Sequence, residues 1–297
     1  VKDYFRLLTK LSIRRDLIPK RPSVRERCTG ELMGEAAERM AKLNDISREA
    51  QDAFALQSHH RAAAAIESGR LAKEIVPVET PDGKTVARDN IVRGDTTIEK
   101  MARLKPAFAE DGTLTAANSS ALTDGAAAVL VMREDKARAL GYIPLAAFRS
   151  WSYDAVDPAG QMLIGPAISM PKALARAGMA LSDVDLVDIH EAFAAQVLCV
   201  LKALNENAGT EEQGLSLGER GTSEDATAPG ISGHPLSPEA VNVHGGSVAL
   251  GHPFAATGAR MVTTMANELA KTNRGTALLG ICGAGGVSAG AVLEHTE

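Results

Sequence analysis

The stretch "TALLGICGAGGVSAG" runs from Thr276 to Gly290. Its apolar beginning, 276–281, predicts a short buried strand, and the small and apolar residues of 288–295 predict a second strand. Between them lies a tight glycine turn. Cys282 sits where the first strand meets the turn, so this thiol either packs in the core or carries chemistry. The rest of the chain has to decide between these two roles.

Strands and helices alternate ahead of this stretch. Apolar residues three and four apart predict helices, and Ser47 and Gly69 mark the start and end of one of them. That helix is expected to show His59 and His60 on an exposed face. The alternation after about residue 142 predicts a layered α/β domain with helices on both faces of a sheet. The predicted helices cover 31–44, 47–69, 98–108, 133–141, 169–178, 191–204 and 254–272, and the predicted strands cover 126–132, 145–151, 184–189, 276–281 and 288–295, with two short strands and a turn within 74–89.

Composition excludes several classes of protein. The net charge is −5, so no overall basic field attracts nucleic acid. No apolar run is long enough to span a membrane, and the start lacks the apolar region of a secretion signal, so we expect a protein that is not secreted. The basic, mildly amphipathic residues 1–20 are expected to form a solvated loop or helix, with contact to a partner or a membrane surface as the alternative.

The chain has three cysteines, and their odd number and wide spacing indicate a reducing compartment. Cys199 lies in an apolar helix and is expected to be a packed core thiol, whereas Cys28 lies in a polar stretch and is expected to be exposed. No metal-ligand spacing is present, so we expect no metal site.

Three polar groups occupy equivalent places in the predicted topology. His190 follows the strand 184–189, Cys282 ends the strand 276–281, and His252 follows "SVAL", 247–250, interpreted as the end of another strand. Open α/β sheets gather ligands at the carboxyl ends of strands. Taken singly, each histidine is more simply a capping or core residue, and "GAGG" lacks the rest of a dinucleotide fingerprint. A thiol with two imidazoles, however, is the minimum set for acyl transfer or a proton shuttle.

The residues also resemble those of a known family, the thiolases. The segments that carry the resemblance are "HEAFAAQ" (190–196), "GGSVALGHPFAATGAR" (245–260), "CGAGG" (282–286) and "MARLKPAFAEDGTLTAANSSALTDGAAAVLVM" (101–132). The histidine of "HEAF", where many thiolases have asparagine, is similar to the β-subunit of the fatty-acid-oxidation trifunctional enzyme and its bacterial counterparts. So are "LIGPAISMPKAL" (163–174) and "LTKLSIRRDLIP" (8–19).

The resemblance implies an α/β thiolase fold, layered α-β-α-β-α, with an α-rich loop domain. It implies an acyltransferase that cleaves 3-ketoacyl-CoA with CoA, giving acetyl-CoA and a shortened acyl-CoA in fatty-acid β-oxidation. It assigns His252 to deprotonating a nucleophilic thiol and to an oxyanion hole, and His190 to holding a water that completes the hole. Cys282 becomes the acid and base for the acetyl-CoA enolate, its pKa lowered by a nearby histidine and by backbone N–H groups of the turn at Gly283 and Ala284.

Coenzyme A enters as substrate, and no cofactor is expected. The resemblance places five side chains along the pantetheine and nucleotide of CoA, although ordinary loop packing is the alternative for each: Met33, Arg93, Phe108, Ser120 and Phe193. The partners it implies are CoA and acyl-CoA, a second copy or a higher homo-oligomer, and a multifunctional hydratase/dehydrogenase α-subunit. The expected location is the bacterial cytoplasm or the mitochondrial matrix.

The resemblance also predicts how the chain is divided. We expect a loop domain over 1–120, the last strand and helix of the N-terminal domain over 121–141, and the C-terminal domain over 142–297, with an insertion at about 205–238. The N-terminal core domain, with the nucleophilic cysteine of the family, is expected to be largely missing, so that the chain alone is inactive in thiolysis. The alternatives are a non-catalytic CoA-ester-binding or scaffold subunit, and biosynthetic acetoacetyl-CoA condensation. A 3-ketoacyl synthase is disfavoured by Cys282.

Overall fold

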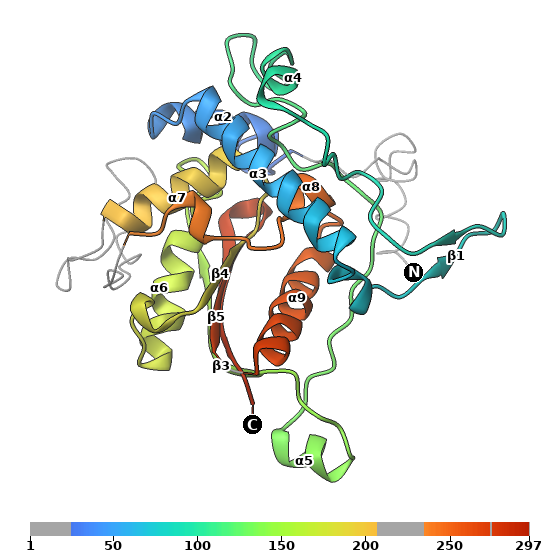
Figure 1. Ribbon diagram of the computed structural model, residues 1–297. Helices are drawn as coiled ribbons and strands as arrows, with labels where there is room; N and C mark the ends of the chain where they lie inside the picture. The colour runs from blue at the N-terminus through green and yellow to red at the C-terminus, as the bar shows by residue number, and fades with distance from the viewer. Residues whose placement is uncertain (1–24, 207–234, 274, 297) are drawn as a thin grey trace, which may run out of the picture.

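A four-stranded mixed sheet forms the centre of the molecule. The computed structural model describes residues 25–206, 235–273 and 275–296 (Figure 1). The strand order is β3-β6-β5-β4, with β4 and β5 parallel and the other two pairings antiparallel. The strands are β3 (Ala147–Ala155), β4 (Leu186–Ile189), β5 (Thr276–Cys282) and β6 (Val287–Glu294).

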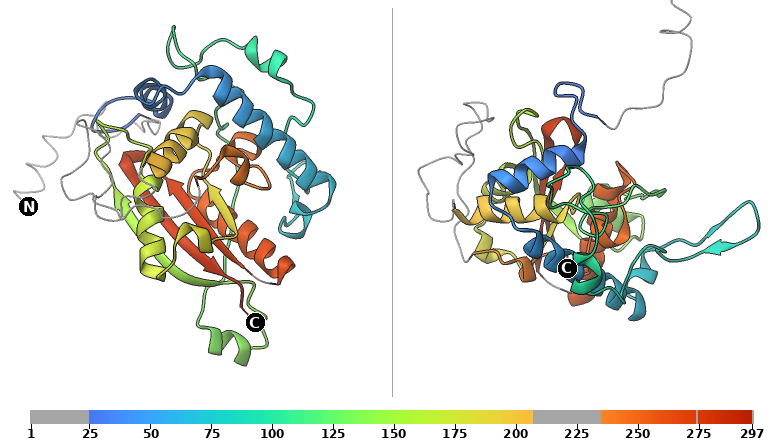
Figure 2. Two further views of the ribbon diagram at one scale, coloured as in Figure 1. Left: turned by 60° about the vertical axis from the view of Figure 1, so that its left-hand side comes forward. Right: turned by 90° about the horizontal axis from the view of Figure 1, so that it is seen from above.

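Helices cover both faces of this sheet, as the alternation predicts. Helix α6 (Pro166–Ala177) contacts β3, β5 and β6 on one face, and α9 (Ala256–Thr272) contacts β4, β5 and β6 on the other (Figure 2). Successive residues of β5 point to opposite faces, so that Leu278 joins the larger core cluster and Leu279 packs with Met265 and Leu269 of α9. The sheet is therefore packed between helices on both of its faces, as the sequence pattern predicts.

Glycines let α6 lie close against the sheet. Gly280 of β5 and Gly290 of β6 are paired across the ladder. A Cβ atom at Gly280 would lie 2.3 Å from the sulfur of Met170, and one at Gly290 would lie 2.3 Å from the carbonyl oxygen of Ser169. Both distances are far below contact, so the close helix–sheet packing requires glycine at each position.

Three further helices stand above one end of the sheet (Figure 1). They are α2 (Met33–Leu43), α3 (Arg48–Glu67) and α7 (Ala194–Glu206), and both α2 and α3 contact α7. Cys199 of α7 is buried, and its Sγ lies 3.5 Å from the Met40 carbonyl oxygen, which confirms the predicted core thiol. Cys28 is exposed, as expected.

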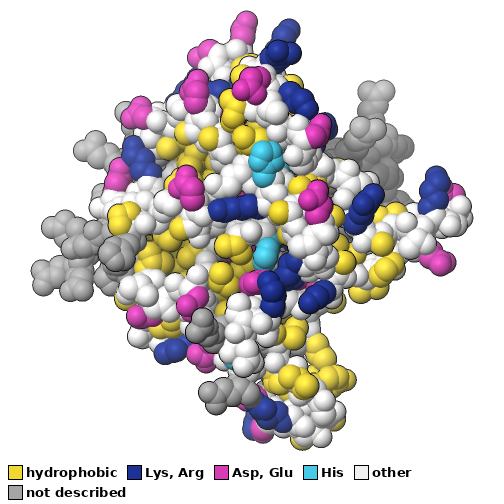
Figure 3. Space-filling model, viewed as in Figure 1, with side chains coloured by type: hydrophobic (Ala, Val, Ile, Leu, Met, Phe, Trp, Pro, Cys, Tyr) yellow, Lys and Arg dark blue, Asp and Glu magenta, His cyan; other side chains and the backbone are white. Residues whose placement is uncertain are grey.

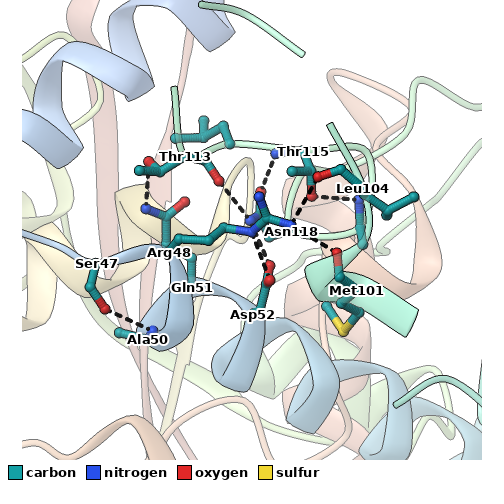
Figure 4. Close-up of polar contacts among 12 residues, drawn as sticks. Ser47, Arg48, Ala50, Gln51, Asp52, Met101, Leu104, Thr113, Thr115 and Asn118 are labelled. Carbon is teal, nitrogen blue, oxygen red and sulfur yellow. Dashed lines mark hydrogen bonds and ion pairs between the residues drawn. The ribbon is translucent and has the colours of Figure 1, made fainter. Parts of the chain in front are cut away.

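A polar network fastens the segment 101–118 to the start of α3 (Figure 4). Ser47 caps the helix, its side chain accepting the Ala50 N–H at 3.1 Å, as the sequence predicts. Arg48 donates to Asp52 at 2.7 Å and to the Met101 carbonyl at 2.8 Å. Asn118 donates to the other oxygen of Asp52 at 2.9 Å. Because these groups are largely buried and paired, they hold in place the loop that continues into Ser119 and Ser120.

The predicted strand 126–132 is wrong. Its backbone joins no ladder in the described structure, and Leu130 and Val131 are 72% and 66% exposed. A strand needs a neighbour for its N–H and C=O groups, and none of the described strands lies beside it. The helix predicted after it forms as α5 (Glu134–Ala139). Apolar side chains are exposed at this lower end of the molecule (Figure 3), among them Leu140, Tyr142 and Ile143.

Two smaller expectations also fail. "SVAL" is not a strand but one turn of helix, α8 (Ser247–Leu250), in which the Leu250 N–H bonds the Gly246 carbonyl at 2.9 Å. A four-residue apolar run has too few residues for its period to separate helix from strand. His59 is buried rather than exposed, because α3 packs against neighbours on more than one side, whereas His60 is exposed as expected.

The remaining elements are small. The two strands predicted within 74–89 form an antiparallel hairpin, and the helix predicted over 98–108 is shorter than expected. The basic start and most of the 205–238 insertion lie outside the described residues. No helix among the described residues has the length and apolar character needed to cross a membrane. These elements are β1 (Val78–Glu79), β2 (Thr85–Val86), α4 (Ile98–Ala102) and the 3-10 turns η2 (Leu71–Lys73), η3 (Leu181–Asp183), η4 (Pro238–Ala240) and η5 (Ala284–Gly286).

Candidate active site

The carboxyl ends of β4 and β5 bring His190 and Cys282 to one edge of the sheet. The two strands are parallel, with Ile189 opposite Gly280. His190 follows β4 directly, and its N–H bonds the Gly280 carbonyl at 2.8 Å, two residues before Cys282. For these two residues the predicted placement at the strand ends is confirmed.

His252 reaches the same place by another route. It lies in the loop between α8 and α9, and its N–H bonds the Ala121 carbonyl at 2.9 Å. Its ring is tilted by 45° against that of His190, with ring centroids 4.4 Å apart. The structure therefore joins the two histidines that the sequence places 62 residues apart, although only one of them follows a strand.

Each ring is held at Nδ1 by a hydroxyl group. Nδ1 of His190 lies 3.1 Å from Oγ of Ser247, and Nδ1 of His252 lies 2.7 Å from Oγ1 of Thr257. A hydrogen bond at one ring nitrogen orients the ring and selects its tautomer. With both Nδ1 atoms engaged, Nε2 is the nitrogen that each ring has left for a ligand.

Both histidines are held in the neutral form. Burial, the neighbouring His252 and the Arg260 guanidinium lower the pKa of His190 well below its usual range. Burial and Arg260 also lower the pKa of His252. A neutral imidazole offers one donor and one acceptor. The pair can therefore present N–H groups to an oxygen, and also accept a proton from a thiol, at neutral pH.

Cys282 differs from the prediction in its acidity. Burial of the thiol raises its pKa to about 12, and a backbone hydrogen bond opposes this only in part. The expected lowering is therefore wrong for the structure as described, because desolvation of the thiolate outweighs the hydrogen bond. A thiol of this kind is protonated at neutral pH, which suits a group that donates a proton to carbon.

The glycine turn after Cys282 serves mainly to reverse the chain. The Gly283 N–H donates to the Val287 carbonyl at 2.8 Å, so this donor, which was expected to lower the pKa of Cys282, closes the turn instead. Ala284 begins η5, and Gly285 has a φ of 80°, a conformation that favours glycine. The turn thus fixes where β5 ends, and with it the position of Cys282.

Glu191, next to His190, is a buried anchor that links four parts of the chain. Its carboxylate accepts the Ser58 hydroxyl of α3 at 2.6 Å, the Asn242 amide at 2.7 Å and the Val248 N–H of α8 at 3.1 Å. Burial raises the pKa of Glu191, and these hydrogen bonds offset part of the effect. The anchor keeps α8, and therefore the start of the His252 loop, in register with the end of β4.

Several residues of the site were not singled out from the sequence. Ser247, Thr257 and Arg260 all lie within the segment 245–260 that carries the resemblance, and polar residues close to a candidate histidine were the available signal. Ser58, by contrast, comes from α3, and nothing in its local sequence indicates contact with Glu191. Such a partner can be found only in the folded chain.

Four of the five CoA candidates lie near one another. The rings of Phe108 and Phe193 meet edge to face, with centroids 5.8 Å apart. Ser120 donates its N–H to the Ala192 carbonyl at 3.0 Å, next to Phe193. The Phe108 ring lies over Gly34, the residue after Met33 at the start of α2. The structure thus groups these side chains, whereas their contact with CoA stays a prediction.

Arg93 lines a different hollow from Phe108. A space of about 410 Å³ is bordered by Arg93, Lys100 and Ser119 among others. The backbone N–H of Arg93 donates to Nδ1 of His59 at 3.2 Å. Burial lowers the pKa of His59 to about 4, and the positive charge of Arg93 adds to this lowering. The neutral ring can therefore accept this N–H and hold the Arg93 loop. Lys100 is paired with Asp95, which also borders the hollow, at 3.1 Å, so the Arg93 guanidinium is the cation here that suits an anionic ligand such as a phosphate.

Asp188 of β4 is expected to make the stability of the fold depend on pH. Its side chain is buried, and burial raises its pKa to about 7, with Arg260 opposing and Glu191 and Glu74 adding to the rise. An acid whose folded pKa exceeds its unfolded value of about 3.9 stabilises the fold most at low pH and loses this as pH rises towards 7.

We therefore expect the free energy of unfolding of the wild-type protein, minus that of Asp188→Asn, to fall by about 1 kcal/mol per pH unit between pH 4 and pH 7. Above about pH 7 the difference should be constant. Urea unfolding of both proteins at pH 5, 6 and 8 measures it. A difference that does not change with pH would contradict the buried, proton-binding state of Asp188.

Among the described residues, no group of three or more His, Cys, Asp or Glu side chains could hold a metal ion.

Two family models match the chain. "Thiolase, N-terminal domain" matches residues 7–135, and "Thiolase, C-terminal domain" matches residues 142–295, just over half of the chain. Among curated proteins, the chain is 47% identical over 287 residues to a "3-ketoacyl-CoA thiolase" of Pectobacterium atrosepticum, covering 95% of this chain and 62% of that one. It is 45% identical over 291 residues to a "3-ketoacyl-CoA thiolase" of Escherichia coli O157:H7, covering 97% and 64%.

Solved structures agree in fold. The chain is similar to the acetyl-CoA acetyltransferase of Bacillus anthracis, with a TM-score of 0.79 and 34% identity over 96% of this chain and 68% of that one. It is also similar to human mitochondrial 3-ketoacyl-CoA thiolase in complex with CoA, with a TM-score of 0.76 and 32% identity over 92% and 61%. The chain thus spans less than two thirds of the length of the curated relatives it matches.

Proposed function

Because the chain belongs to the thiolase family and has its fold, we propose that it carries the enolate-handling half of a site that cleaves 3-ketoacyl-CoA with CoA. The single observation behind this proposal is the His190–His252 pair, with both Nδ1 atoms anchored, at the strand edge that ends in Cys282. We assign the degradative reaction because the relatives at 45–47% identity are named 3-ketoacyl-CoA thiolases.

The proposed chemistry needs an oxygen binder and a proton donor. When a nucleophilic thiol attacks the 3-keto carbon, its proton passes to His252. The bond between C2 and C3 then breaks, and its electron pair stays on C2 as the enolate of acetyl-CoA. His252, together with a water held by His190, binds the enolate oxygen in a site largely closed to water. Cys282 gives its S–H proton to C2, which releases acetyl-CoA. The raised pKa of Cys282 ensures that the proton is present beforehand.

We propose that the nucleophilic thiol comes from polypeptide outside this chain's sequence. Of its own three thiols, Cys199 is buried in α7 with a pKa raised to about 12, Cys28 is exposed in a short polar stretch, and Cys282 serves the proton. Exposed apolar side chains support an additional covering layer: Trp151 and Tyr153 of β3 are 54% and 77% exposed. On this proposal the division at 120, 141 and 142 applies, and the three thiols of this chain do not complete thiolysis by themselves.

We also propose ligands, partners and a cellular location for this chain. CoA and acyl-CoA would bind along Met33, Phe108, Ser120 and Phe193, with Arg93 near the phosphates. The trifunctional β-subunit type, a homo-oligomer and a hydratase/dehydrogenase partner rest on the sequence resemblance. The two curated relatives described above are bacterial, which supports the bacterial cytoplasm rather than a mitochondrial matrix.

Deuterium exchange into the methyl group of acetyl-CoA tests this function on the chain as it exists. Enolate formation needs the oxygen binder and the proton-handling thiol, and no nucleophile. In D₂O we expect exchange above the buffer rate, followed by mass spectrometry, and no thiolysis of acetoacetyl-CoA by the same sample.

His252→Ala should lower the exchange rate by about 10²-fold, the usual cost of an oxyanion donor. Calorimetric titration with CoA should show that the variant still binds, because His252 acts on the thioester oxygen. Binding of CoA without any exchange by the wild-type chain would favour the alternative of a non-catalytic CoA-ester-binding or scaffold subunit.

A further inference from the structure

Ser247 stands between His190 and a cation. Its Oγ lies 3.1 Å from Nδ1 of His190, and it accepts a hydrogen bond from Nη2 of Arg260 at 3.3 Å. Ser247 is fully buried, and His190 is almost so. Ser247 comes from α8 and Arg260 from the first turns of α9, so two helices converge on the ring that follows β4.

The protons of this group can be counted. An arginine only donates hydrogen bonds, so one lone pair of the Ser247 oxygen receives the Arg260 N–H. The hydroxyl has a single proton of its own, and in the described structure its other partner is Nδ1 of His190. A hydroxyl that already accepts from a cation is a better donor and a poorer second acceptor. This favours a hydroxyl proton that points to Nδ1, with Nδ1 as the acceptor.

We propose that Ser247 and Arg260 are positioning residues that force His190 into the tautomer with its proton on Nε2. This rests on the function proposed above and deepens it, because it makes Nε2–H of His190 a fixed donor to the thioester oxygen or to the water that binds it. An oxyanion needs donors, and a ring that presented a lone pair there would repel it.

The same geometry distinguishes the two histidines. His252 is anchored by Thr257, whose hydroxyl contacts no cation among the described residues, so the tautomer of His252 can change as this ring takes and returns a proton. His190 has a cation behind its anchor and is restricted to donating. The pair therefore divides into a ring for proton transfer and a ring for oxygen binding.

Nitrogen NMR of the chain labelled with ¹⁵N-histidine shows which ring nitrogen of His190 carries the proton, and it needs no substrate. We expect His190, assigned from its loss in His190→Gln, to show a protonated Nε2 and an unprotonated, hydrogen-bonded Nδ1. In Ser247→Ala the Nδ1 resonance should move towards that of an unbonded nitrogen. Ser247→Thr, which keeps the hydroxyl, should restore it, and Arg260→Met should give a mixture of tautomers.

Exchange kinetics provide the second readout. Ser247→Ala should lower the exchange rate at saturating acetyl-CoA by about tenfold, with KM changed less than about twofold. Arg149→Met, which removes an arginine at the sheet edge paired with Glu294, is the matched control and should change neither spectrum nor rate.

A proton on Nδ1 in the wild-type chain would overturn the proposal, as would spectra of His190 that are the same in wild type, Ser247→Ala and Arg260→Met. The NMR result does not depend on turnover. A chain with the expected tautomer and no exchange would therefore count against the proposed function alone.

Discussion

Replacing Cys282 by alanine is expected to slow deuterium exchange into acetyl-CoA by at least about 100-fold, the contribution of a positioned acid or base. In the exchange reaction the thiolate removes a methyl proton and returns a deuteron. Cys199, the other buried thiol, lies in α7 against Met40 and does not replace the sulfur. The rate measured by mass spectrometry should fall while CoA binding, measured by calorimetry, is retained.

The rate of deuterium exchange is also expected to rise with pH. Because the pKa of Cys282 is raised to about 12, only a small fraction is thiolate at neutral pH. The fraction, and with it the enzymatic exchange rate, should rise about tenfold per pH unit between pH 7 and pH 9. The lowered pKa values of His190 and His252 keep both rings neutral throughout this range, so they add no step.

Cys199→Ala is the matched control, because Cys199 is also buried with a pKa raised to about 12 but lies in α7 against Met40. This variant should lose some stability and keep the exchange rate and its pH slope. Equal exchange by Cys282→Ala and wild type would remove Cys282 from the mechanism. A pH-independent rate would show that the thiol is not desolvated as the structure indicates.

Glu191→Gln is expected to lower the free energy of unfolding by about 2–4 kcal/mol, a large effect for a nearly isosteric change. The carboxylate accepts from Ser58, Asn242 and Val248. Ser58 has to donate its proton to Glu191, because its own oxygen accepts the Gly246 N–H at 3.1 Å. A glutamine has a single oxygen, so its NH₂ group must face one of these three donors.

Asn242 cannot turn round to relieve this clash. Its side-chain oxygen accepts the Ile189 N–H at 2.7 Å, and its amide donates to the Ile189 carbonyl at 2.8 Å. Urea unfolding measures the loss, and Glu110→Gln, an exposed loop position, should change stability by less than about 0.5 kcal/mol. A Glu191→Gln protein as stable as wild type would mean that the buried carboxylate is already protonated and donating.

Local patterns were sufficient for most of the framework. Short runs of apolar residues predict β4 and β5, and a run of small and apolar residues predicts β6. The three-and-four spacing predicts α2, α3, α6, α7 and α9, because the helical period follows from backbone geometry alone. Ser47 as a cap follows from its hydroxyl and the N–H groups left open at a helix start. The resemblance of 190–196, 245–260 and 282–286 to the thiolases identified the family.

Patterns failed where the outcome depended on distant neighbours. The run 126–132 is as apolar as β5, yet it is irregular because strand structure requires a partner. Residues 247–250 are too few for a period, and their helix depends on Gly246 and Glu191. His59 is buried by contacts that α3 makes with other elements, which its own sequence does not encode.

The sequence by itself predicted most of the elements, the family that the chain resembles, and a site made of two imidazoles and a thiol. Only the tertiary structure decided their chemical states. The pKa of Cys282 depends on how completely the fold excludes water from it, and the tautomer of His190 depends on Ser247 and Arg260 from two other helices. Solvation and hydrogen bonding act through space, so they are decided only after the chain has folded.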